Sequence, residues 1–284
     1  MDSTWTQKVA VTVAGALGVL SNALSGAGGD QGIGGVSQAN PTWLTPDGPT
    51  FIIWALIFTL VILLVVAQWC PDDETEALLS QRCPLTKLQV RWRITLYLLM
   101  NALWPPVFVR SYFFVSLVII CIYLGGLISV LTVLNTRSMT GLCQWVLFAA
   151  PNVVHASWVA VATVLNFFTW AGTLGWEDDL GIAGSPRAAM AVVVLLTGVA
   201  GVMAVGRWEF AWSAVTAWAV AGIYRMQSGS DADGFPPEAL NATLAVVAKW
   251  STVAALLLTA AGALLFIIDS CRPSCKDHRL LPLA

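Results

Sequence analysis

The feature that most constrains this chain is a series of apolar runs, each about as long as a bilayer is thick. A helix of roughly 20 apolar residues crosses the hydrocarbon core of a membrane. Eight such runs can be read along the 284 residues: 9–24, 51–69, 94–109, 113–134, 144–170, 188–205, 208–224 and 244–268. They are too long for the strands of a membrane barrel, which need only ~10 alternating residues. The sequence therefore predicts an all-α integral membrane protein with about eight transmembrane helices.

The composition agrees with this prediction. Hydrophobic residues make up 57% of the chain and charged residues 11%, whereas a soluble globular chain carries about 25% charged residues. We therefore expect the lipid bilayer to be the main partner of the surface. A net charge of −2 and the lack of a basic patch argue against a nucleic-acid partner. The first run is short and could instead be a signal peptide, but one lysine against one aspartate before it favours an uncleaved anchor.

The placement of lysine and arginine predicts the orientation. With eight spans, both termini lie on the same side as the loops that follow spans two, four and six. Ten of the fourteen basic residues fall on that side, and four fall on the other. Cytoplasmic loops carry the excess of lysine and arginine, so both termini are expected in the cytosol. The identity of the membrane is left open.

A long glycine-rich loop without lysine or arginine, residues 25–49, is expected on the outer side. Glycines allow a flexible lid over a binding site, with Trp43 as an apolar plug or interface anchor and Pro46 at the entry to the next span. A disordered loop is the alternative.

The fifth run carries an unusual polar stripe. Pro151, His155, Trp158, Ala162 and Asn166 are spaced 4, 3, 4 and 4, which places them along one face of a helix. Polar groups inside a membrane must face protein or a cavity, because lipid offers no hydrogen bonds. Three other runs present comparable residues: Phe51, Trp54 and Phe58 in the second, Asn101, Trp104 and Phe108 in the third, and Asn22 in the first.

These faces have two interpretations. They could line an aromatic pocket, or they could simply join helices, since asparagines within membranes often hydrogen-bond across an interface. His155 shares the ambiguity, because it could contact the polar edge or central metal of a ligand, or only bridge two helices. A single histidine supplies one axial position, so strong heme capture is not expected.

Three stretches resemble the signatures of the tryptophan-rich sensory protein family, also called the translocator protein or peripheral benzodiazepine receptor family. They are "TPDGPTFIIWALIF", "LMNALWPPVFV" and "APNVVHASWVAVATVLN", in the family's order. The resemblance extends over residues 8–172. The family core has five spans and this chain has three more, so it looks like a longer branch, in which "RWEFAWSAVTAWAVAGIY" resembles a recurring late segment. His155, at a position where an aromatic residue is common, and Pro105-Pro106 depart from the pattern.

The resemblance implies a TspO-like five-helix bundle (residues 1–172), followed by a three-helix extension with a short cytosolic tail (173–284). It also implies a membrane receptor or sensor whose pocket binds a small apolar ligand, either a tetrapyrrole or a sterol-like molecule. The residues expected at the pocket are Asn22, Phe51, Trp54, Phe58, Asn101, Trp104, His155, Trp158, Ala162 and Asn166, with Trp43 and Pro46 as the lid.

Other classes of function stay open beside this one. A transporter would be expected to carry charged residues deep in its spans or two similar halves, and neither is seen. Some bacterial members of the family are reported to promote porphyrin breakdown, but no catalytic motif or metal site is found in this sequence. We therefore expect no catalytic residues and no obligatory cofactor, with a porphyrin or heme-type molecule as the candidate ligand. A scaffold with an empty pocket and a homodimer are further alternatives.

Overall fold

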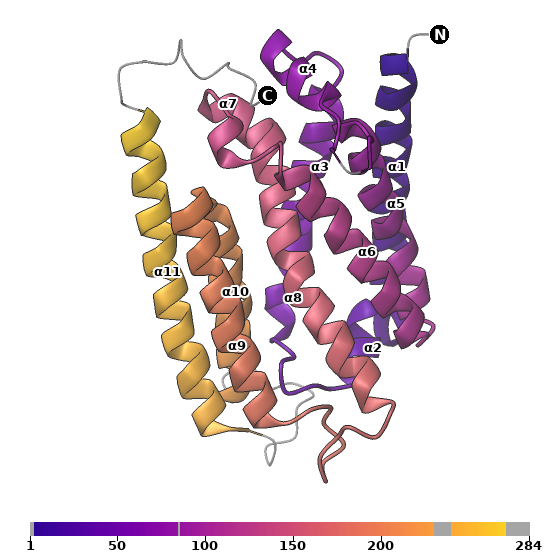
Figure 1. The fold of residues 1–284 in the computed structure, drawn as a ribbon. Helices are drawn as coiled ribbons and strands as arrows, with labels where there is room; N and C mark the ends of the chain where they lie inside the picture. The colour runs from indigo at the N-terminus through magenta and orange to yellow at the C-terminus, as the bar shows by residue number, and fades with distance from the viewer. Residues whose placement is uncertain (1–2, 85, 230–239, 271–284) are drawn as a thin grey trace.

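The protein is a bundle of long helices (Figure 1). The computed structural model describes residues 3–84, 86–229 and 240–270. A helix lies at each of the eight expected spans: α1 (Ser3–Gly26), α3 (Ile53–Ala67), α5 (Val90–Phe108), α6 (Phe113–Leu131), α8 (Ala150–Gly172), α9 (Pro186–Gly201), α10 (Phe210–Gln227) and α11 (Ala242–Ser270). Short helices lie between them: α2 (Ile33–Ala39), α4 (Asp73–Ser80) and α7 (Leu142–Gln144). Pairing of β type in the described ranges is limited to isolated bridges, so the prediction of an all-α fold is confirmed there. The expected tail lies outside the described residues.

Six helical segments of the described chain are long and apolar enough to cross a membrane: Thr4–Gly26, Gly48–Ala67, Phe113–Ser138, Leu142–Gly172, Pro186–Gly206 and Ala242–Ile268. The protein is therefore a multi-pass integral membrane protein. Helices α5 and α10 are less apolar, and α5 begins with the charged Arg91 and Arg93. Both nevertheless run beside the six segments (Figure 1).

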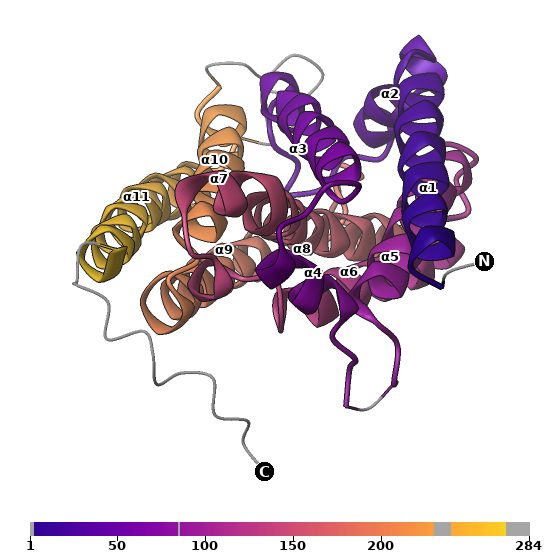
Figure 2. The same ribbon diagram turned by 90° about the horizontal axis from the view of Figure 1, so that it is seen from above.

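The helices form two neighbouring groups. Helices α1, α5, α6 and α8 pack one against the next, and α3 contacts both α1 and α8 (Figure 2). The second group consists of α9, α10 and α11, and it joins the first where α10 packs against α8. Helix α1 begins and α11 ends at the same end of the molecule (Figure 1). Residues 27–47, with α2, lie at the opposite end, so the relative placement of loops and termini follows the expected alternation.

Small residues determine how closely α1 approaches its neighbours. A Cβ atom on Gly18 would lie 2.9 Å from Nδ2 of Asn101, and one on Gly15 would lie 2.9 Å from Val65. Such close approach between helices is typical of glycine positions in membrane proteins. It brings Asn22 within hydrogen-bond distance of Asn101, whose Oδ1 accepts from Asn22 Nδ2 at 3.0 Å.

Helix α8 starts with a change in helical pitch. A single π-helical turn, Trp145–Ala149, precedes Pro151, which lies in the first turn of α8. Proline is tolerated in a first helical turn because its missing N–H has no helical partner there. The π turn shifts the face that α8 presents, as such single-turn insertions do.

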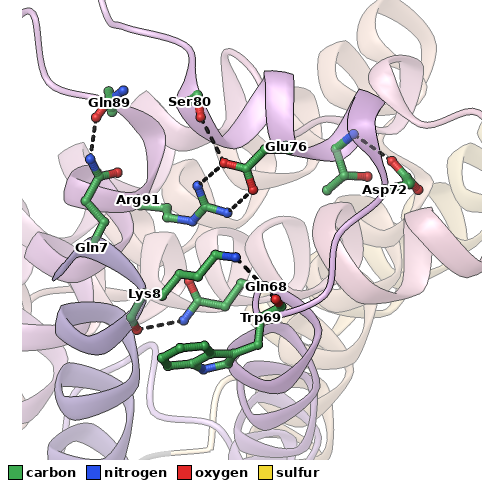
Figure 3. Close-up of polar contacts among 10 residues, drawn as sticks. Gln7, Lys8, Gln68, Trp69, Asp72, Glu76, Ser80, Gln89 and Arg91 are labelled. Carbon is green, nitrogen blue, oxygen red and sulfur yellow. Dashed lines mark hydrogen bonds and ion pairs between the residues drawn. The ribbon is translucent and has the colours of Figure 1, made fainter. Parts of the chain in front are cut away.

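A polar cluster ties four helices together at the end where α1 begins (Figure 3). Arg91 of α5 is fully buried and donates two hydrogen bonds to the Glu76 carboxylate of α4, at 2.7 and 2.6 Å. The hydrogen bonds from Arg91 lower the pKa of Glu76. Gln68 Nε2, at the end of α3, donates to the carbonyl of Lys8 in α1 at 3.0 Å. The cluster fixes the ends of α1, α3, α4 and α5 relative to one another.

A second contact at this end joins the two groups of helices. Glu209, immediately before α10, is fully buried. It accepts hydrogen bonds from the backbone N–H of Thr136 at 3.1 Å and from the Thr136 hydroxyl at 2.6 Å. Thr136 belongs to the connection between α6 and α8, so the start of α10 is held against the first group.

Candidate ligand-binding pocket

Helix α3 presents an aromatic face to the interior. Phe51, in the 3₁₀ turn Gly48–Ile52 that leads into α3, precedes Trp54 and Phe58 at spacings of three and four residues. The rings of Trp54 and Phe58 stack with centroids 5.5 Å apart. All three side chains are half-buried, so each combines packing with an accessible surface.

Helix α8 supplies the facing wall. Trp158 is almost fully buried, with 1% of its surface exposed. Its ring meets Phe51 and Trp54 edge to face, at centroid distances of 5.9 and 6.2 Å. Aromatic pairs favour this geometry, because the positive edge of one ring meets the negative face of the other. Helix α5 adds Trp104 and Phe108, which stack at 5.0 Å.

Two adjoining hollows lie between these walls. The outer one has a volume of about 320 Å³, and the inner one is a narrow space of about 40 Å³. Ile33, Ser37, Thr45, Phe51 and Trp54 border both, so the two are continuous parts of one site. The outer hollow alone reaches the range of ligand pockets, roughly 300–1,000 Å³.

The expected site residues are largely brought together there. Those that line the outer hollow are Asn22, Pro46, Phe51, Trp54 and Phe58, and those that line the inner hollow are Phe51, Trp54, Trp104, Trp158, Ala162 and Asn166. The walls contain aromatic, aliphatic and neutral polar side chains and no charged one. The site therefore suits an apolar ligand with a few polar atoms.

Asn166 organises the inner wall. Its Oδ1 accepts hydrogen bonds from Trp104 Nε1 and from the Ser116 hydroxyl, each at 2.9 Å. Its Nδ2 donates to the carbonyl of Phe113 at 3.3 Å. These bonds connect α5, α6 and α8 and fix the orientation of the Trp104 ring, so most of the polar capacity of Asn166 is used within the protein.

The indole N–H of Trp158 differs from that of Trp104. Its Nε1 atom is buried and has no hydrogen-bond partner among the described residues. Buried donors are nearly always paired, since leaving one unpaired costs about 1–3 kcal/mol. Trp158 borders the inner hollow, and its unpaired indole N–H is therefore a candidate donor to a polar atom of a ligand.

His155 lies outside the walls of both hollows. It is fully buried behind Trp54, with their ring centroids 6.2 Å apart. Its Nε2 forms a hydrogen bond with the hydroxyl of Tyr123 on α6, and its ring meets Tyr97 and Tyr123 edge to face. This placement favours the packing alternative over direct ligand contact.

Two other expected site residues also lie away from the hollows. Asn101 is buried between α1 and α5, where it accepts the hydrogen bond from Asn22. Trp43 lies in a separate hydrophobic cluster with residues of α8 to α11, and its Nε1 donates to Asp178 at 3.1 Å. Trp43 thus anchors the 25–49 loop to the connection between α8 and α9, instead of covering the cavity.

Helices α1, α2, α3, α5, α8 and α10 all contribute residues to this aromatic cavity. A family model described as TSPO-like protein matches residues 5–264.

The chain belongs to the TSPO-like protein family.

No curated protein and no solved structure matches the chain. The TSPO-like match extends beyond the 8–172 of the sequence resemblance, through α9 and α10 and into α11. The family pattern therefore includes the three C-terminal helices.

The TSPO-like pocket also contains wall residues that the sequence did not indicate. Several come from the 25–49 loop, among them Ile33 and Ser37, one turn apart on α2, and Thr45. The i, i+4 spacing of Ile33 and Ser37 is a weak signal that both lie on one face of a short helix. Another is Met226, near the end of α10. No local pattern marks Met226, because its place in the wall depends on how α10 docks.

In this TSPO-like protein the 25–49 loop is ordered. It forms α2 and a segment that exchanges backbone hydrogen bonds with Ala183, Trp43 N to Ala183 O at 3.3 Å and Ala183 N to Pro41 O at 3.0 Å. The disordered alternative is therefore wrong for this loop. Within the described residues, no group of three or more histidine, cysteine or acidic side chains could hold a metal ion.

Proposed function

We propose that this protein is a membrane receptor or sensor that binds a tetrapyrrole-like or sterol-like molecule in the cavity below the 25–49 loop. The observation that carries the proposal is the uncharged cavity bordered by Phe51, Trp54, Phe58, Trp104 and Trp158. Flat apolar ligands gain free energy by stacking on indole and phenyl rings, and a few polar groups fix their orientation. Membership of the TSPO-like family supports this class of ligand.

The proposal includes a membrane orientation. We propose that α5 and α10 cross the bilayer together with the six longer apolar segments, giving eight spans. Seven of the eleven basic residues in the described ranges belong to segments at the end where α1 begins, and this excess supports a cytosolic location for that end and the opposite side for the 25–49 loop. The cavity would then open toward the outer leaflet or the outer solution.

A titration with protoporphyrin IX tests the binding function. The purified protein in nanodiscs is expected to shift the absorption of the porphyrin in a saturable manner. Trp54→Ala should weaken binding by about tenfold or more, because it removes buried aromatic area and edge-to-face contacts. Trp250→Ala is the matched control, since Trp250 is largely exposed on α11. Non-saturable binding, or equal affinity in the Trp54 variant with an intact fold, would contradict the proposal.

The alternatives predict different outcomes of related assays. A transporter would cause sealed vesicles that contain the protein to take up more porphyrin than vesicles without it. A porphyrin-degrading protein would consume the ligand over time under light. A receptor or sensor should bind without either change.

A further inference from the structure

We infer that α10 completes the pocket: Met226 forms part of its wall, and Arg225 fixes the position of its rim. The inference rests on the proposed function for the ligand, and it assigns to the C-terminal helices a role in the same site. The rim is the segment Pro46–Thr50, in which Pro46 and Gly48 border the outer hollow.

The contact between α10 and the rim is a paired charge. Arg225 donates from Nε to Asp47 Oδ2 at 2.6 Å and from Nη2 to Asp47 Oδ1 at 2.9 Å. Asp47 is fully buried, whereas the Arg225 side chain keeps 30% of its surface exposed. Arg225 Nη2 also reaches the Thr50 hydroxyl at 3.1 Å. A two-point pair of this kind fixes direction as well as distance.

Backbone contacts hold the same segment against α10. The N–H of Asp47 donates to the carbonyl of Gly222 at 3.3 Å, and Trp218 Nε1 donates to the carbonyl of Thr50 at 2.8 Å. A Cβ atom on Gly222 would lie 2.0 Å from the Thr50 hydroxyl oxygen, so the rim can approach only because this position is glycine. Three successive turns of α10 therefore contribute to the rim.

Met226 connects this contact to the cavity itself. It follows Arg225 directly, is 5% exposed and borders the same outer hollow as Phe51 and Trp54. Methionine adapts its shape and contacts aromatic rings favourably through sulfur. Its side chain thus sets the size of the hollow from the side of the C-terminal helices.

The rim can be tested without a ligand. Hydrogen exchange of the protein in nanodiscs should show that Arg225→Gln increases exchange in residues 43–50 by about tenfold or more, because the buried Asp47 loses its partner. Arg187→Gln is the control, since Arg187 is exposed at the start of α9 and its loss removes the same charge at the same end. Exchange in 43–50 that is unchanged by Arg225→Gln, or increased equally by Arg187→Gln, would overturn the role of Arg225.

The place of Met226 in the wall can be tested by changing the size of its side chain. Met226→Trp should reduce protoporphyrin IX affinity by about tenfold or more by filling the hollow, whereas Met226→Leu conserves volume and should bind within about threefold of the unmodified protein. Thermal unfolding shows whether each variant folds. Wild-type affinity in a folded Met226→Trp variant would overturn the wall assignment. If the unmodified protein itself binds no porphyrin, the proposed function fails, and the exchange result alone decides the role of α10.

Discussion

Replacing Trp158 by phenylalanine should weaken ligand binding while leaving the protein folded. The substitution keeps an aromatic ring near Phe51 and Trp54, whose centroids lie 5.9 and 6.2 Å from that of Trp158. It removes the buried Nε1 donor, which has no partner among the described residues. The loss of affinity should therefore measure what the Nε1 donor and the larger indole ring contribute to binding.

The magnitudes can be worked from these contacts. In the ligand-free protein, removal of an unpaired buried donor should raise the free energy of unfolding by about 1–3 kcal/mol. The smaller ring loses packing, which costs a similar amount at roughly 1 kcal/mol per carbon group. The two terms nearly cancel, so the melting temperature should change little. In the complex, loss of a hydrogen bond and of part of the aromatic contact costs about 1–2 kcal/mol, or roughly five- to thirtyfold in Kd.

Absorbance titration with protoporphyrin IX in nanodiscs measures Kd, and thermal unfolding measures stability. Trp250→Phe provides the control, because the same chemical change is made on the exposed face of α11. The reasoning is refuted if folded Trp158→Phe binds like the unmodified protein, or if Trp250→Phe loses as much affinity.

Three further predictions concern other parts of the molecule. His155→Phe should lower the free energy of unfolding by about 1–3 kcal/mol, because the buried Tyr123 hydroxyl loses its partner. The Kd of the folded variant for protoporphyrin IX should stay unchanged. Weaker binding with an unchanged melting temperature would contradict this prediction. Gly34→Cys, in open space on α2, should react with an impermeant maleimide only from the side opposite the N-terminus, and labelling from the cytosolic side would reverse the orientation. Because the pKa of Glu76 is lowered from its ordinary value of 4.5 by hydrogen bonds from Arg91, the stabilisation from this pair should be present above pH 4.5 and lost as pH falls through the lowered pKa. Melting temperatures of Glu76→Gln and the unmodified protein should accordingly converge in acid, and a constant difference would argue against the contribution of the pair.

Local pattern was sufficient for much of this site. Phe51, Trp54 and Phe58 share a face because of their spacing alone, and that face borders the cavity. Trp158 and Ala162 were predicted in the same way on the facing helix. Apolar length also placed a helix at each expected span, since a span must satisfy its backbone hydrogen bonds internally.

Residues that depend on a distant partner could not be assigned. His155 follows the same spacing as Trp158, but its Nε2 forms a hydrogen bond with the hydroxyl of Tyr123 on α6. No helical pattern within α8 predicts that partner. Met226 borders the outer hollow next to Arg225, which pairs with Asp47, a residue far from it in sequence. The π turn before Pro151 adds a rotation to α8 that a regular period does not include.

The two carboxylate contacts of α10 have a mechanical consequence. Glu209 holds the beginning of the helix to Thr136, and Asp47 pairs with Arg225 near its end, so both ends of α10 are attached to segments of the first group of helices. Between these points an apolar groove of about 340 Å³, bordered by Leu56 and Val215, separates α3 from α10. Sliding of α10 along its axis would stretch both attachments together. A change in bilayer thickness should therefore tilt α10 together with the first group of helices and not shift it along its own axis.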